Sequence, residues 1–146
     1  MRPKIWHHIM TALGLMILLA ATLFAVIHWH AIPEQVPTHF DASGQASGYG
    51  GKNTITFLLI MAWVTYVMIT VISFFPNAWN MPGRNRPNGL RAAADMMAVM
   101  RPTLAFLFGW LIFCSAQGRG LGAWFLPVTM GAPLGNVLIG IARAMR

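Results

Sequence analysis

The sequence has few charged residues and almost no acidic ones. Only 9% of its 146 residues are charged and only three are Asp or Glu, whereas 57% are hydrophobic. A soluble domain of this length needs more polar surface than this composition provides. We therefore interpret the chain as an integral membrane protein, with the lipid bilayer as a partner.

Cysteine is also nearly absent. The single Cys114 excludes an intramolecular disulfide, and it gives no information on the redox compartment. It falls in an apolar run, where we expect it to fill space between helices. Since no internal repeat or low-complexity tract is present, the sequence predicts a single domain over residues 1–146.

Four apolar runs predict an all-α protein with four transmembrane helices. A helix crosses the hydrocarbon layer of about 30 Å with roughly 20 residues. The expected spans are about 9–31, 54–75, 96–117 and 121–143, with an outer loop at 32–53 and an inner loop at 76–95. The third apolar stretch is short and follows Arg101 and Pro102. It can still span if its helix begins near Leu90 or Ala92 and Arg101 extends towards the lipid head groups.

Basic residues divide unequally between the two sides of these helices. With a cytoplasmic N-terminus, only Lys52 and Arg119 lie outside. The other eight lie inside, namely Arg2, Lys4, Arg84, Arg86, Arg91, Arg101, Arg143 and Arg146. The positive-inside rule therefore predicts that both termini are cytoplasmic. Membrane topology explains the basic balance without nucleic acid, for which the chain carries no binding motif.

The fourth apolar run carries small residues at every fourth position. Ala132, Asn136, Gly140 and Ala144 form one ridge, which predicts a helix-packing face. Asn136 either forms a hydrogen bond to another helix or acts as a ligand for an ion or substrate, and a single isolated amide favours the first role. Its candidate partners are Thr65 and Ser73, which lie on one face of the second helix.

The outer loop, in contrast, is polar and rich in turn-forming residues. Pro33 ends the first helix, and Val36 to Phe40 has the character of a short strand. Asp41 to Gly44 predicts an Asx-type turn closed by glycine. Gly48, Gly50 and Gly51 allow positive φ values before the next helix. We expect an ordered turn or small hairpin on the outer membrane surface, with Phe40 and Tyr49 in the interface.

The same loop resembles a known signature. It reads P-x-x-V-P-T-H-F-D-A-x-G from Pro33 to Gly44 and G-Y-G-x-K from Gly48 to Lys52. This is similar to the domain of unknown function that opens the SdpI-type bacterial membrane proteins, here in a short four-helix form. The resemblance marks as the candidate site Pro33, Pro37, Thr38, His39, Phe40, Asp41, Gly44, Gly48, Tyr49, Gly50 and Lys52.

The resemblance implies a protein of the bacterial inner membrane that gives immunity to, or senses, a secreted membrane-active peptide through this loop. Repressor sequestration is not expected, because Gly89-Leu90-Arg91 is followed by alanines and not by the T-P-W-T of that family. The alternative is a small accessory subunit of a larger membrane complex, which would dock through the outer loop and the fourth helix.

Other chemistry finds less support in the sequence. His28, His30, His39 and Asp41 are candidate metal ligands, but the first two point about 200° apart on a continuous helix and no metal motif is present. Ser43 is too close in sequence to His39 and Asp41 for a catalytic triad. None of the acidic residues falls in a predicted span, which argues against a pump. We expect no enzyme activity and no cofactor.

Overall fold

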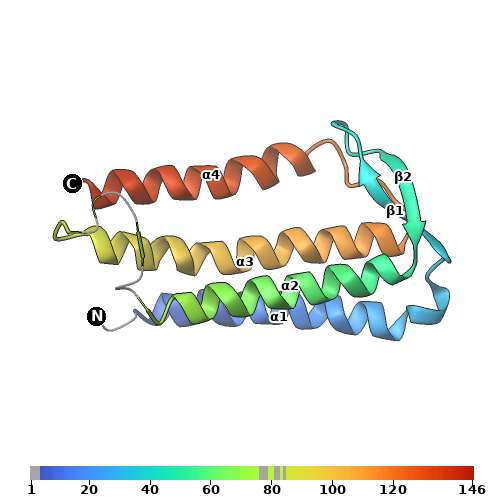
Figure 1. Ribbon diagram of the computed structural model, residues 1–146, viewed down its shortest axis with the longest axis horizontal. Helices are drawn as coiled ribbons and strands as arrows, with labels where there is room; N and C mark the ends of the chain where they lie inside the picture. Colours follow the sequence, from blue (N-terminus) through green and yellow to red (C-terminus); the bar gives the residue numbers. More distant parts are fainter. Residues whose placement is uncertain (1–3, 76–78, 81–82, 84) are drawn as a thin grey trace.

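The computed structural model describes residues 4–75, 79–80, 83 and 85–146, so Arg2 and Arg84 of the predicted inside charges lie outside the described residues. Four helices in this part are long and apolar enough to cross a membrane, and a two-stranded hairpin joins the first two (Figure 1). The predicted architecture is thus confirmed. The elements are α1 (Ile5–Ile27), the 3-10 turn η1 (Trp29–Ala31), β1 (Gln35–Phe40), β2 (Ala46–Gly51), α2 (Asn53–Ile72), α3 (Gly89–Ala116) and α4 (Phe125–Ala144).

Two helix boundaries differ from the predicted ones for local reasons. α1 ends at Ile27, before the predicted residue 31, and the chain then turns into η1; the His28 ring bonds the carbonyl of Phe24 at 3.0 Å at this end. α3 begins at Gly89, close to the start near Leu90 or Ala92 that the sequence allows and before the predicted span at 96, since Ala92 and its alanine neighbours are strong helix formers. Part of the predicted inner loop is therefore helix.

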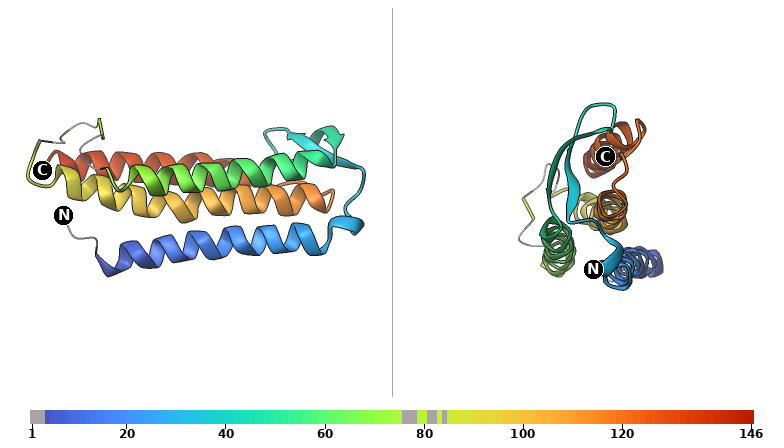
Figure 2. Two further views of the ribbon diagram at one scale, coloured as in Figure 1. Left: turned by 60° about the horizontal axis from the view of Figure 1, so that its bottom comes forward. Right: turned by 90° about the vertical axis from the view of Figure 1, so that its right-hand side faces the viewer.

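The centre of the bundle is α3. It packs against α1, α2 and α4, whereas α4 packs chiefly against α3 and lies apart from the other two helices (Figure 2). Small side chains on α3 permit this close packing, because in lipid the approach of helix backbones contributes much of the association energy. The buried alanines of α3 are Ala92, Ala93, Ala98, Ala105 and Ala116.

Gly14 of α1 occupies the tightest crossing with α3. A Cβ atom placed there would lie 3.2 Å from the backbone nitrogen of Pro102 and 2.8 Å from a ring carbon of Tyr66 on α2. Glycine is thus the residue that lets three helices meet at this point. The polar residue beside this crossing is Arg101, whose backbone carbonyl carbon would lie 3.3 Å from the same Cβ.

The predicted ridge on α4 packs in its second half. Gly140 and Ala144 are buried, whereas Ala132 is exposed. The amide of Asn136 donates to the backbone carbonyl of Met96 on α3 at 3.0 Å. The expected partners on α2 are therefore wrong, because α4 does not lie beside α2 and the nearest acceptor is an α3 carbonyl.

The two ends of the bundle differ. Lys4 and Arg146, the first and last described residues, lie at one end, which we call the termini end (Figure 1). The hairpin of β1 and β2 lies at the other, the hairpin end. An even number of spans places both ends of the described chain on one side of a bilayer.

Candidate functional site

The hairpin at the hairpin end contains all the residues of the loop signature except Pro33 and Lys52, which flank it. β1 pairs antiparallel with β2, from Gln35 opposite Gly51 to Phe40 opposite Ala46. The register shifts on both sides of His39. An irregularity of this kind bends a strand and redirects a side chain. His39 is thus presented at the most irregular point of the sheet.

The turn between the strands is built on Asp41. Its Oδ1 accepts hydrogen bonds from the amide of Ser43 at 2.9 Å, from the amide of Gln45 at 2.9 Å and from the Ser43 hydroxyl at 2.7 Å. Gly44 closes the turn with φ +78°, as the sequence predicts. The Ser43 hydroxyl, followed by the amide of Gln45, lowers the pKa of Asp41 below its ordinary value of 3.8.

The later glycines of the loop have a different role from the predicted one. Gly48, Gly50 and Gly51 do not have positive φ, because they lie in the extended strand β2. Two of them provide space instead. A Cβ on Gly50 would lie 2.8 Å from the Thr38 methyl group, and one on Gly48 would lie 3.2 Å from Cβ of His39. These glycines let the side chains of β1 fold over β2.

The hairpin is docked firmly on the helix ends. The carbonyl of Gly44 accepts a hydrogen bond from the amide of Leu121 at 2.7 Å, in the connection between α3 and α4. A Cβ on Gly44 would lie 2.6 Å from the carbonyl oxygen of Gly122. Phe40 packs on the buried cluster that contains Cys114 and Leu121, and the burial of Cys114 there fits its expected packing role. The hairpin therefore covers the ends of α3 and α4.

The base of the hairpin is fixed to α1 and α2. Val36 is fully buried with Ala25 and Ile55 in a second cluster. The ammonium group of Lys52 lies 4.9 Å from the centre of the Trp29 ring and 3.9 Å from the Glu34 carboxylate. A cation over a tryptophan face is attractive. These contacts hold both strands in one position relative to the membrane spans.

Four residues of the signature are exposed, and one of them, Asp41, uses its carboxylate in the turn. Tyr49 is 63% exposed, and Pro33 and His39 are also exposed. The His39 Nδ1 atom is 3.1 Å from the Thr38 hydroxyl, which orients the ring without covering it. His39 and Tyr49 are thus the exposed signature residues of the hairpin whose side chains are not used in the turn.

The structure places no group of three or more His, Cys, Asp or Glu side chains, among the residues it describes, where they could hold one metal ion. His28 bonds its own helix through Phe24, and His39 lies in β1 with Thr38 as its neighbour. The four candidate ligands are therefore not brought together.

A second polar cluster lies near the termini end and was not predicted. Arg101 is 6% exposed, so the expectation that it extends to the head groups is wrong. Its guanidinium donates to the Thr11 hydroxyl on α1 at 2.8 Å and to the Ser73 hydroxyl after α2. The Tyr66 hydroxyl donates to the carbonyl of Thr11. We call these four residues the arginine cluster.

A contact between a histidine and a carboxylate lies roughly one and a half helical turns further towards the termini. Nε2 of His7 on α1 is 2.9 Å from Oδ1 of Asp95 on α3. Asp95 lies in the second turn of α3, just before the predicted span that begins at 96. His7 thus connects two helices.

These residues could have been found only through helix depth. Thr11 and Ser73 lie near the ends of their predicted spans on the same side of the membrane as Arg101. A comparison of depths would have placed hydroxyl groups beside the guanidinium. The helix start at Gly89 agrees with the start near Leu90 or Ala92 that the sequence allows.

The fold defines a multi-pass membrane protein with four candidate spans and an ordered hairpin between the first two. Residues 16–65 match a family described as Domain of unknown function (DUF1648). The chain thus contains a DUF1648 domain, which runs from Met16 in α1 to Thr65 in α2 and includes the whole hairpin. No curated protein and no solved structure matches the chain.

Proposed function

We propose that this protein acts, like the SdpI-type proteins, in immunity to or sensing of a secreted membrane-active peptide in a bacterial inner membrane, and that its hairpin binds the peptide. The supporting observation is that the residues of the signature fall into two groups with different contacts. Most of its residues have contacts inside the chain that fix the hairpin, whereas His39 and Tyr49 project from it.

The sheet itself offers a mode of binding. Each strand of a two-stranded sheet has one edge whose backbone groups are unpaired. β1 packs on α3, whereas β2 is the freer strand and is rich in glycine. An extended peptide can add to such an edge through backbone hydrogen bonds, with side-chain contacts setting specificity. We assign backbone pairing to β2 and side-chain recognition to His39 and Tyr49.

The proposal involves no catalytic step. The hydroxyl of Ser43 donates to the Asp41 carboxylate at 2.7 Å and so serves the turn. A serine nucleophile needs a base strong enough to take its proton, and the hydrogen bonds that lower the pKa of Asp41 make its carboxylate a weak base. The polar groups of the hairpin are arranged to hold a shape, and binding is the activity that this arrangement supports.

Protection of a strain that lacks the gene tests this proposal. We expect the deletion strain to be sensitised to a secreted membrane-active peptide and the wild-type gene to restore resistance. His39→Gln keeps hydrogen bonding but removes the imidazole, so this variant should reach the membrane at normal levels and give little protection. His30→Gln changes an exposed histidine outside the hairpin and should protect fully.

Two results would contradict the proposal. A deletion strain that is no more sensitive than its parent would reject the immunity role. Full protection by His39→Gln at normal levels would make His39 part of the scaffold, and the candidate site would then be at the termini end, around Arg86 before α3 and Arg91 in its first turn.

A second candidate function is that of an accessory subunit in a larger membrane complex, and α4 favours it. This helix packs chiefly on α3, and a Cβ atom added at Gly131 or Gly135 would meet no other atom within 4 Å. Small residues without neighbours are typical of helix interfaces in membranes. Purification from native membranes separates the two functions, because an accessory subunit should copurify with stoichiometric partners.

A further inference from the structure

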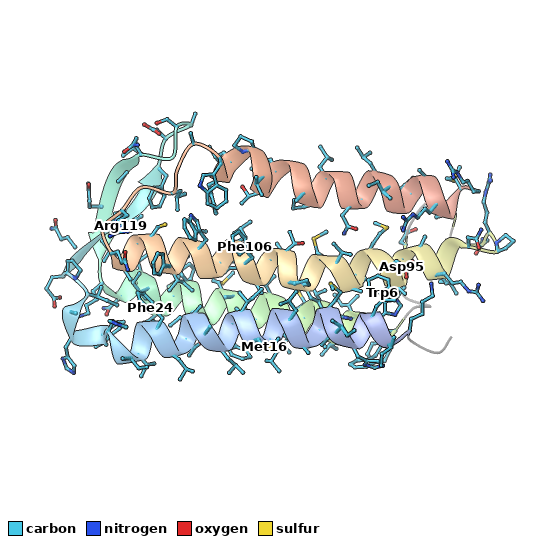
Figure 3. All side chains as sticks on the ribbon, turned by 180° about the vertical axis from the view of Figure 1, so that it is seen from behind. Trp6, Met16, Phe24, Asp95, Phe106 and Arg119 are labelled. Carbon is cyan, nitrogen blue, oxygen red and sulfur yellow. The ribbon has the colours of Figure 1, made fainter. Side chains whose placement is uncertain are left out.

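A small cavity opens at the termini end, where α3 forms the floor between α1 and α4. Its volume is about 50 Å³. Six of the residues that line it are Trp6, Asp95, Met96, Asn136, Gly140 and Arg143. α1 and α4 make at most marginal contact with each other, so the cavity opens on the side of α3 that lies between them, which we call the groove. Figure 3 shows Trp6 and Asp95 together at this end of the bundle.

The cavity has charges of opposite sign on two of its walls. Asp95 lies on α3, where one carboxylate oxygen is held by His7 at 2.9 Å. The other oxygen has no hydrogen-bond partner among the described residues. Arg143 lies in the last turn of α4 and, within the described part of the chain, forms no ion pair with Asp95. The two charges are therefore separated by the cavity and available to a ligand.

The position of the cavity narrows the class of ligand. Trp6, in the first turn of α1, is of the residue type that prefers the head-group level of a bilayer. Asp95 is about 9 Å along α3 from its first residue, by the rise of a helix. A single free carboxylate oxygen is a poor site for a metal ion, which needs several ligands. A carboxylate opposite a guanidinium instead matches a molecule that carries both a cation and an anion.

We propose that this cavity binds the head group of a zwitterionic phospholipid with a primary ammonium group, a phosphatidylethanolamine. The ammonium group enters the cavity and donates to Asp95, which His7 orients. The phosphate remains at the mouth and accepts from Arg143, and the acyl chains lie in the groove between α1 and α4. A volume of about 50 Å³ holds the ammonium end and not the whole head group.

Native mass spectrometry of the full chain with graded lipids tests the proposal without any substitution. Phosphatidylethanolamine and its singly, doubly and triply N-methylated forms share the phosphate but lose N–H donors one by one. We expect retention to fall about tenfold across the series, as the loss of a charge-assisted hydrogen bond predicts. Phosphatidylglycerol, which has the phosphate alone, should bind no better than the trimethylated form. Equal retention of all these lipids would overturn the proposal.

Substitutions of Asp95 and Arg143 then test which part of the head group each residue binds. Asp95→Asn should abolish the preference for the primary ammonium, and Arg143→Gln should weaken all the lipids about fivefold, since a charged contact to phosphate is lost. Glu34→Gln and Arg119→Gln make the same kinds of chemical change at the hairpin end. They should alter neither the preference for the primary ammonium nor the retention of the lipids. An unchanged preference in Asp95→Asn would reject the site.

Soluble phosphoethanolamine distinguishes a lipid from a free metabolite with the same head group. We expect a large excess of it to leave the bound lipid in place, because the acyl chains add apolar contact in the groove. Displacement of the lipid would assign the cavity to the soluble compound and overturn the lipid assignment.

Discussion

Arg101 shows how this bundle holds a charge that has no carboxylate beside it. Removing a guanidinium from water costs several kcal/mol, and an ion pair or hydrogen bonds must offset that cost. Here part of the offset comes from the hydroxyl groups of Thr11 on α1 and of Ser73 just after α2, while the Arg101 Nε has no partner among the described residues. The guanidinium in turn connects α1, the end of α2 and α3. The arginine cluster therefore stabilises one relative position of three helices.

Removal of one of these acceptors should destabilise the bundle. Thr11→Val replaces a hydroxyl by a methyl group of similar size and leaves a buried guanidinium N–H unpaired, which costs about 1–3 kcal/mol. Thr129→Val is the matched control, because its hydroxyl bonds only a carbonyl of its own helix, that of Leu126. We expect the control to stay within about 0.5 kcal/mol of wild type. Unfolding in mixed detergent micelles measures the stability of both variants. Equal losses of stability in Thr11→Val and Thr129→Val would show that the hydrogen bond to Arg101 has no special role.

Asp41 predicts how the hairpin responds to acid. Its folded-state pKa lies below the ordinary 3.8, so its contribution to the turn is complete above pH 3.8 and is lost as pH falls through the lower, folded-state value. The amide signals of Ser43 and Gln45, followed by NMR during acid titration, should report that midpoint. In Ser43→Ala the midpoint should move up towards 3.8, because the hydroxyl is the largest cause of the shift. A midpoint that does not move would contradict this assignment.

At the scale of elements, the crossing of α1 and α3 depends on Gly14. A Cβ there meets backbone atoms of α3 and the ring of Tyr66, neither of which yields easily. We expect Gly14→Ala to destabilise the protein by about 1–3 kcal/mol, the usual cost of overpacking. Gly131→Ala on α4 makes the same change where nothing lies within 4 Å and should be neutral. If thermal melting in detergent shows both variants equal to wild type, the crossing is looser than described.

The elements that local signals determine could be predicted from the sequence. Apolar run length predicts the four helices, and the proline, Asp41 and Gly44 positions predict the hairpin and its turn. The bond of the His28 ring to the Phe24 carbonyl depends on the geometry of the last turn of α1, and the role of Gly48 and Gly50 depends on which β1 side chains face them. These are contacts rather than patterns, so composition and spacing do not reveal them.

At the scale of the whole molecule, the polar sites at the two ends of the bundle differ in how far they could be predicted from the sequence. The hairpin site is contiguous in sequence and could be predicted as one stretch. The arginine cluster and the pair of His7 with Asp95 combine residues from separate helices, including partners 88 and 90 positions apart. Their assembly requires the order and depth of the helices around α3, which the apolar runs alone leave open.

The orientation of the molecule in the membrane stays a prediction and can be tested directly. The eight-to-two split of basic residues places the termini end in the cytoplasm and the hairpin outside. Gln45 in the hairpin and Asn85 before α3 are both exposed. We expect Gln45→Cys, in a Cys114→Ala background, to react with an impermeant thiol reagent on intact spheroplasts, and Asn85→Cys to react only after lysis.

The controls of this experiment follow from Cys114 being the single cysteine of the chain. The Cys114→Ala background should show no labelling before or after lysis, because it contains no other cysteine. Labelling at both positions after detergent lysis establishes that each thiol is reactive, so a difference on intact spheroplasts reports sidedness alone. Reaction of Asn85→Cys but not of Gln45→Cys on intact cells would invert the orientation, and the peptide-binding proposal would fail with it, because the hairpin would then face the cytoplasm.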